Sequence, residues 1–144
     1  MKALSVRNPY AHFILCEEKG VECRSWQTDY RGDLLICSSA NPKIKNTISG
    51  HALCVVTLES IEKFTKEHLD AACMGDMPEG KNFAWHLTNV RPVKPFPVKG
   101  KLNFFNVDDS LIEIIDNGDD SLTEEEAQAL YTKYYEPLLY KGRE

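Results

Sequence analysis

The segment KGVECRSW, residues 19–26, places two cations, a carboxylate and a tryptophan close together. If residues 21–24 form a strand, Glu22 and Arg24 project from the same face, since side chains two positions apart in a strand point the same way. A guanidinium held by a carboxylate is a rigid fork that suits a phosphate group or a base edge, whereas Lys19 is a mobile point charge. From the charges alone, a structural Glu22–Arg24 ion pair with a solvated Lys19 is the simpler explanation.

A catalytic role for the same segment is a second hypothesis. Glu22, partly desolvated beside Trp26, would act as a general base on a bound water, and Lys19 or Arg24 would stabilise the oxyanion. That chemistry is hydrolysis without a covalent intermediate.

Three aromatic residues have rings that can stack on a base. Trp26 and Tyr30 lie in or just after the charged segment, and Trp85 lies inside a strand-like run. We expect them to flank a cleft or, as an equal alternative for Trp85, to fill the core.

Four polar residues extend the candidate site. Lys99 and Lys101 flank Gly100 in a loop whose backbone N–H groups suit a phosphate. Arg31 precedes a turn glycine and can contact phosphate or simply be exposed. We expect Asn8 first to cap a helix and only secondarily to contact a ligand.

The cysteines and histidines give no pattern typical of a metal site or a disulfide framework. The five cysteines lack a CxxC pair, and the four histidines lack HxH and HxxxH pairs. We expect reduced thiols in a cytoplasmic protein, with no metal and no other cofactor.

The composition predicts one soluble domain with an appendage. The chain has 144 residues, of which 42% are hydrophobic and 27% are charged. No apolar run approaches the roughly 18–20 residues of a membrane span, so no membrane partner is expected. The N-terminal segment lacks a small-residue cleavage site, so we do not expect a signal peptide.

The charged residues are distributed unequally along the chain. Residues 1–107 carry 14 Lys and Arg against 11 Asp and Glu, and residues 108–144 carry 3 against 11, within a formal net charge of -5. A mildly basic body suits a polyanionic partner. The acidic tail could screen a basic cleft, dock another protein or simply cover the body.

Hydrophobic patterning predicts a small, mostly β, α+β domain that resembles a barrel. Helices are expected at residues 9–18 and 61–74, the first with Asn8 as its N-cap. Strands are expected at residues 2–6, 21–26, 32–39, 51–60, 83–93 and 102–107, with a proline-rich edge or loop near residues 95–101.

A further helix is predicted near the C-terminal end. Thr123 and Glu126 form a capping box before residues 124–136, whose apolar positions include several tyrosines. We therefore divide the chain into a domain at residues 1–108 and an acidic loop with a helix at residues 109–144, packed on that domain.

Five blocks of the chain resemble the ASCH domain, a family named for homology to an activating signal cointegrator. They are ALSVRNPYAHFIL, KGVECRSW, TDYRGDLLICSS, ALCVVTLES and FPVKGKLNFF, and together they span most of residues 1–108. The pattern K-x-x-E-x-R-S-W followed by T-x-x-R-G is the most specific part. The chain departs from the family at Asn8-Pro9-Tyr10, where Q-P-W is usual, and at Glu17, where glycine is usual. The resemblance implies a PUA-like β-barrel with peripheral helices.

The resemblance also implies a function. ASCH domains are similar to nucleic-acid modules with a cleft for RNA or a single flipped base. One bacterial branch removes the acetyl group from N-acetylated cytidine with a lysine, a threonine and a glutamate, and another member has been described as a ribonuclease. The lysine corresponds to Lys19, but the threonine position holds Glu22, which cannot replace an alkoxide nucleophile. The glutamate should lie in or near KEHLDAAC, where Glu67 and Asp70 are candidates.

The resemblance favours a ligand site over a purely structural ion pair. We expect a module that binds RNA, another single-stranded nucleic acid or a modified nucleoside in a cleft lined by the candidates above. The first alternative is a small hydrolase, acting like the acetylcytidine amidohydrolases or as a ribonuclease, with Lys19 and Glu22 as its catalytic residues. The second is a protein-interaction module that uses the acidic C-terminal helix.

Overall fold

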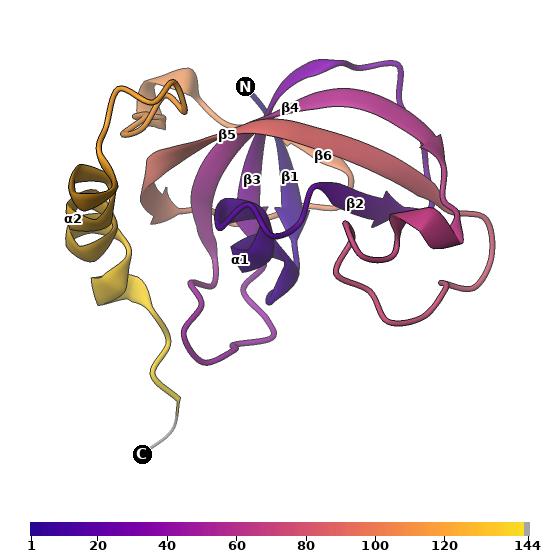
Figure 1. The fold of residues 1–144 in the computed structure, drawn as a ribbon, viewed down its shortest axis with the longest axis horizontal. Helices are drawn as coiled ribbons and strands as arrows, with labels where there is room; N and C mark the ends of the chain where they lie inside the picture. Colours follow the sequence, from indigo (N-terminus) through magenta and orange to yellow (C-terminus); the bar gives the residue numbers. More distant parts are fainter. Residues whose placement is uncertain (143–144) are drawn as a thin grey trace.

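The computed structural model describes residues 1–142, which form one curled six-stranded sheet with helices beside it (Figure 1). The strand order is β2-β5-β4-β3-β1-β6, and only the β1/β3 pair is parallel. The strands are β1 (Lys2–Val6), β2 (Val21–Arg24), β3 (Gly32–Ser38), β4 (His51–Lys63), β5 (Phe83–Pro97) and β6 (Phe104–Asn106). The sheet curls into a half-barrel, which confirms the expected small α+β, PUA-like fold.

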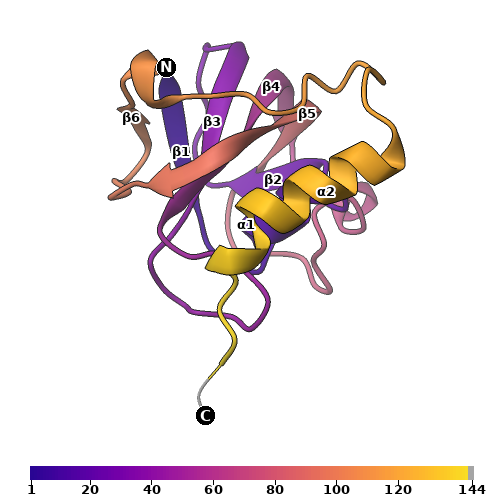
Figure 2. The ribbon, with the colours of Figure 1, turned by 90° about the vertical axis from the view of Figure 1, so that its left-hand side faces the viewer.

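Two α-helices and three 3₁₀ turns complete the fold. The helices are α1 (Tyr10–Leu15) and α2 (Glu124–Tyr134). Figure 2 shows α2 on the same side of the molecule as α1, and side chains of both helical regions pack against the larger core cluster. The 3₁₀ turns are η1 (Lys66–His68), η2 (Asp109–Leu111) and η3 (Glu136–Leu138).

Strand β3 is buried on both faces, which explains its unbroken apolar run. Leu34 and Ile36 point into the larger core cluster, and Leu35 and Cys37 point into a second cluster on the other face. A central strand covered on both sides has no solvated face and therefore no polar alternation.

The helix predicted at residues 61–74 is absent. Strand β4 continues to Lys63, with Ile61 opposite Trp85 on β5, and only the short turn η1 follows. The helical spacing of Phe64 and Ala72 has another cause, because both side chains are buried in a small cluster around the turn. Pairing with a long neighbouring strand outweighs the local helical pattern.

Asn8 is not the N-cap of α1. Pro9 occupies that position and makes no side-chain cap, while the Asn8 amide is buried and donates to the carbonyl of Ile48 at 2.8 Å. Asn8 therefore joins α1 to the loop before β4, and the helix ends at Leu15, earlier than residue 18.

The C-terminal helix is attached to the sheet through Tyr135. The predicted capping box is present, with Thr123 and Glu126 each accepting the other's backbone N–H. Tyr135, one residue after α2, is buried, and its hydroxyl lies within hydrogen-bonding distance of the carbonyls of Leu53 and Val93. Burial raises the pKa of this phenol.

No helix among residues 1–142 combines the length and apolar character that a bilayer span requires.

Candidate functional site

A cleft with a volume of about 1030 Å³ lies where the charged segment meets the end of β1. Segments around residues 74–82 and 98–103 form further walls. The charged residues that line the cleft are Arg7, Lys19, Glu22, Arg24, Lys99 and Lys101. Five of these six are basic, so the cleft is strongly positive although the chain as a whole is acidic.

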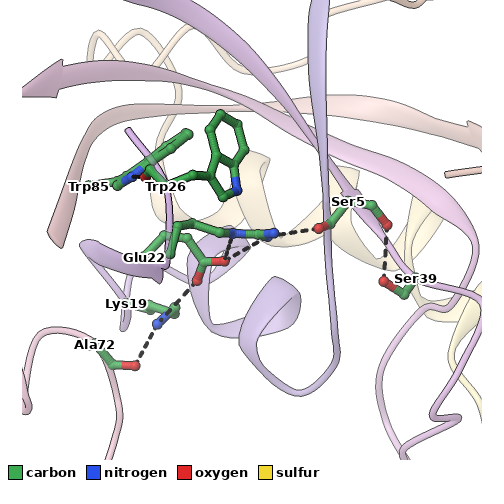
Figure 3. A network of polar contacts seen from close by, with 8 residues as sticks. Ser5, Lys19, Glu22, Trp26, Ser39, Ala72 and Trp85 are labelled. Carbon is green, nitrogen blue, oxygen red and sulfur yellow. Dashed lines mark hydrogen bonds and ion pairs between the residues drawn. The ribbon is translucent and has the colours of Figure 1, made fainter. Parts of the chain in front are cut away.

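A series of polar contacts crosses the floor of this cleft, and Figure 3 shows most of its members. Lys19 donates to the carbonyl of Ala72 at 2.5 Å, and its ammonium lies 3.5 Å from Oε1 of Glu22. Arg24 donates through Nε to Oε2 of Glu22 and through Nη2 to the carbonyl of Ser5, both at 2.8 Å. The predicted same-face placement of Glu22 and Arg24 on β2 is therefore present.

Lys19 is a fixed group, contrary to the expectation of a mobile or solvated charge. The residue is 3% exposed, and its ammonium lies 5.0 Å from the centre of the Tyr10 ring. Burial lowers the pKa of Lys19, and the adjacent Glu22 carboxylate opposes this shift without cancelling it. The short segment between α1 and β2 therefore holds an ammonium that sheds its proton more readily than a surface lysine.

Arg24 has donor capacity left for a ligand. Its Nε and Nη2 are used by Glu22 and Ser5, whereas Nη1 has no acceptor in the portion of the chain that the structure describes. The side chain is 22% exposed and lines the cleft. Glu22 orients the guanidinium, so the free N–H groups have a defined direction.

The three aromatic candidates have different positions. Trp26 is half-buried and lines the cleft, where it packs edge-to-face on Trp85 and Phe104 with ring centres 4.7 and 5.1 Å away. Trp85 is 0% exposed and donates its indole N–H to the carbonyl of Trp26, so it is a core residue and cannot stack on a ligand. Tyr30 packs on Phe104 outside the cleft lining.

The other candidates also separate into two groups. Lys99 and Lys101 line the cleft and are exposed. Arg31 does not line it, because its guanidinium donates to the carbonyls of Thr28 and Tyr30 and so closes its own turn. Asn8 is likewise outside the cleft lining.

The two candidates for the family's catalytic glutamate lie outside the cleft. Glu67 and Asp70 are exposed and do not line the cleft. The position next to Lys19 is taken by the carbonyl of Ala72. Within residues 1–142, Glu22 is the only carboxylate in the cleft lining, and both of its oxygens already face a cation.

The sequence did not predict several residues of the cleft. Arg7 lines the cleft just after β1. The hydroxyls of Ser5 on β1 and Ser39, one residue after the parallel strand β3, lie 3.0 Å apart. Gly100 presses against Ser5, where an added Cβ would lie 2.6 Å from Oγ. Arg7 is adjacent to the Asn8-Pro9-Tyr10 block, which was its one sequence signal, whereas the other contacts join residues far apart in the chain.

The search of curated proteins found no match. The search of solved structures matched two mutant forms of ZmASCH from Zymomonas mobilis, each with a TM-score of 0.58 and 15% identity. These matches cover 91% and 92% of this chain, and 96% and 94% of the respective ZmASCH chains. An ASCH structure from the same organism has a TM-score of 0.53 and 17% identity, with 91% of this chain and 93% of that chain covered. At these identities the likeness shows a shared fold.

The sequence itself carries the evidence for the family. The ASCH domain model matches residues 4–97, which hold the end of β1, all of β2 to β5 and the segment from Lys19 to Trp26. This match covers more than half of the chain, and the fold agrees with that of solved ASCH structures. The chain belongs to the ASCH domain family.

Proposed function

We propose that this ASCH domain binds RNA or another single-stranded nucleic acid in the cleft between β2 and the 98–103 loop. The observation that carries the proposal is the charge of the lining, in which five basic side chains face one carboxylate. That carboxylate is already shared by Lys19 and Arg24, so it does little to repel an incoming phosphate. Phosphate contacts supply a large share of the affinity of proteins for nucleic acids.

The cleft offers different contacts to the two parts of a nucleotide. Arg7, Lys99 and Lys101 are exposed at its edges, where they can follow a phosphate backbone. Trp26 and the fixed Arg24 lie deeper, where an unstacked base can meet a ring and a directed donor. This arrangement suits a splayed single strand better than a duplex, whose bases are not free to enter.

A modified nucleoside is a smaller ligand that the same cleft can hold. The salt dependence of binding distinguishes a nucleoside ligand from a nucleic-acid ligand. Binding of a labelled single-stranded RNA should weaken steeply as salt rises, whereas binding of a nucleoside without phosphates should change little. Fluorescence anisotropy of the RNA, competed with unlabelled nucleosides and with DNA of the same sequence, measures this. Absence of any RNA binding at low salt refutes the proposal.

Hydrolysis is the second candidate function, and one observation favours it. Lys19 is buried with a lowered pKa, which brings its amine closer to proton transfer at neutral pH. Incubation with N-acetylated cytidine and an acetylated RNA, followed by mass detection of the product, tests this. Turnover that disappears in both Lys19→Ala and Glu22→Gln supports an amidohydrolase, and no turnover with retained RNA binding supports a binding module. A protein partner at α2 stays a prediction.

A further inference from the structure

Three potential metal ligands from separate segments meet at the far end of the β4–β5 pair. They are Glu62 on β4, His68 on η1 and His86 on β5, and one ligand atom from each lies within 4.8 Å of the other two. Oε2 of Glu62 lies 2.6 Å from Nε2 of His86 and 3.3 Å from Nε2 of His68. None of the three lines the cleft.

Strand register explains why Glu62 and His86 share a face of the sheet. Ser60 lies opposite His86, so Glu62 lies diagonally across from His86 on the same side of the sheet. Ile61 and Trp85, which lie opposite each other, point to the other side and into the core. The turn η1 then brings His68 back to the same place, with its ring 5.4 Å from that of His86.

We propose that Glu62, His68 and His86 bind one divalent transition-metal ion of the zinc class. Two imidazoles and one carboxylate are a common three-ligand set for zinc, with a water in the fourth position. Zinc bonds of about 2.0–2.2 Å in a tetrahedron separate the ligand atoms by roughly 3.3–3.6 Å. The Glu62–His68 separation of 3.3 Å already fits, and the Glu62–His86 contact of 2.6 Å must open slightly.

His68 also has an outer partner for the metal-bound state. The backbone N–H of Thr65 donates to Nδ1 of His68 at 2.9 Å, so without metal the ring proton is on Nε2, facing Glu62. A metal at Nε2 requires the ring proton on Nδ1, so the hydrogen bond from the Thr65 backbone N–H must break. The ring then has to turn until Nδ1–H donates to Oγ1 of Thr65, which lies 3.3 Å away. Thr65 is exposed, so water replaces the acceptor that its backbone N–H loses.

The ion would also restrain residues 66–74, the segment at one side of the cleft. Shortly after His68, the carbonyl of Ala72 accepts from Lys19, and the carbonyl of Ala71 accepts from the N–H groups of Gly20 and Val21. Val21 also pairs with His86 in the sheet. Metal binding therefore links the wall of the cleft to β4 and β5, whatever ligand the cleft takes.

Isothermal titration of zinc into metal-stripped protein tests the proposal. A Cys16→Ser background removes the exposed His12–Cys16 pair, whose ring nitrogen and sulfur lie 3.5 Å apart and could bind zinc separately. We expect one zinc per chain. Glu62→Gln and His86→Ala should each lower the affinity by at least about tenfold, since even outer partners contribute that much.

Matched controls keep the test decisive. His51→Ala removes a histidine outside the cluster, one that bonds to the carbonyl of Ser49, and should leave zinc affinity unchanged. Glu62→Gln alters an exposed side chain and should leave the circular dichroism spectrum unchanged. Failure of zinc to bind, or binding that survives both Glu62→Gln and His86→Ala, overturns the proposal. Slower hydrogen exchange at residues 66–74 in the zinc-bound protein than in the metal-free protein supports the restraint of this segment, and unchanged exchange there contradicts it.

Discussion

Removing Lys99 and Lys101 together should weaken RNA binding by a calculable amount. Both lysines are exposed and line the cleft, and within residues 1–142 neither has an ion-pair partner. Their loss therefore leaves no buried charge behind. Each phosphate that a lysine neutralises on a single strand releases about 0.7 counterion.

The released counterions set the magnitude. At about 0.15 M salt, 0.7 counterion contributes roughly 0.8 kcal/mol, so the double variant loses about 1.6 kcal/mol, or about 15-fold in affinity. The slope of log affinity against log salt should fall by about 1.4. Fluorescence anisotropy of a labelled single-stranded RNA at several salt concentrations measures both quantities.

A matched variant controls for net charge. Lys94→Ala/Lys133→Ala removes the same charge from residues outside the cleft lining, around the ring of Tyr134. It should change the affinity little, because neither lysine lines the cleft and salt screens exposed charges that do not contact the ligand. Equal losses in the two double variants, or an unchanged salt slope for Lys99→Ala/Lys101→Ala, would refute the assignment of phosphate contacts to this loop.

Three further changes separate the contributions of stacking, loop position and burial. Trp26→Leu should cost about 1–3 kcal/mol of RNA affinity with an unchanged salt slope, as stacking on a base requires; a reduced slope in the same anisotropy assay contradicts that role. Gly100→Ala forces a Cβ to 2.6 Å from Oγ of Ser5, so it should lower RNA affinity, and Ser5→Gly should restore it; loss without rescue argues against the contact. Tyr135→Phe should cost about 1–2 kcal/mol at neutral pH by removing the buried hydrogen bond that its single O–H makes to the carbonyls of Leu53 and Val93, measured by urea unfolding. The pKa of Tyr135 is raised in the folded state, so its contribution to stability is complete below about pH 10 and falls by about 1.4 kcal/mol per pH unit above it. Above pH 10 the free energy of unfolding of Tyr135→Phe should therefore fall less steeply with pH than that of the wild type. Parallel curves of unfolding free energy against pH contradict this.

Local patterns predicted the parts of the fold that local chemistry decides. The capping box of Thr123 and Glu126 is present, and the run around Leu35 is a buried strand. The pattern failed at residues 61–74, where Ile61 pairs with Trp85 on a distant strand. A window of sequence contains no information about such a partner, so periodicity alone favoured a helix.

The candidate site shows the same division. Alternation along β2 correctly placed Glu22 beside Arg24, because two residues of one strand need no knowledge of the rest of the fold. Sequence spacing could not reveal that the carbonyl of Ala72 would hold Lys19, nor that Gly100 would press on Ser5. Those contacts depend on how the sheet curls. The cluster around Glu62 escaped for the same reason, since its ligands come from three segments.

The burial of Tyr135 has a consequence for folding during synthesis. Its hydroxyl reaches Leu53 across 82 residues and Val93 across 42, and its ring belongs to the larger core cluster. Contacts of such sequence separation form late and slow folding. A ribosome-bound chain in which Tyr135 has not yet emerged therefore has an incomplete core, although every residue of the cleft precedes Tyr135 in the chain. The residues of the cleft are therefore synthesised before the residue that completes the larger core cluster.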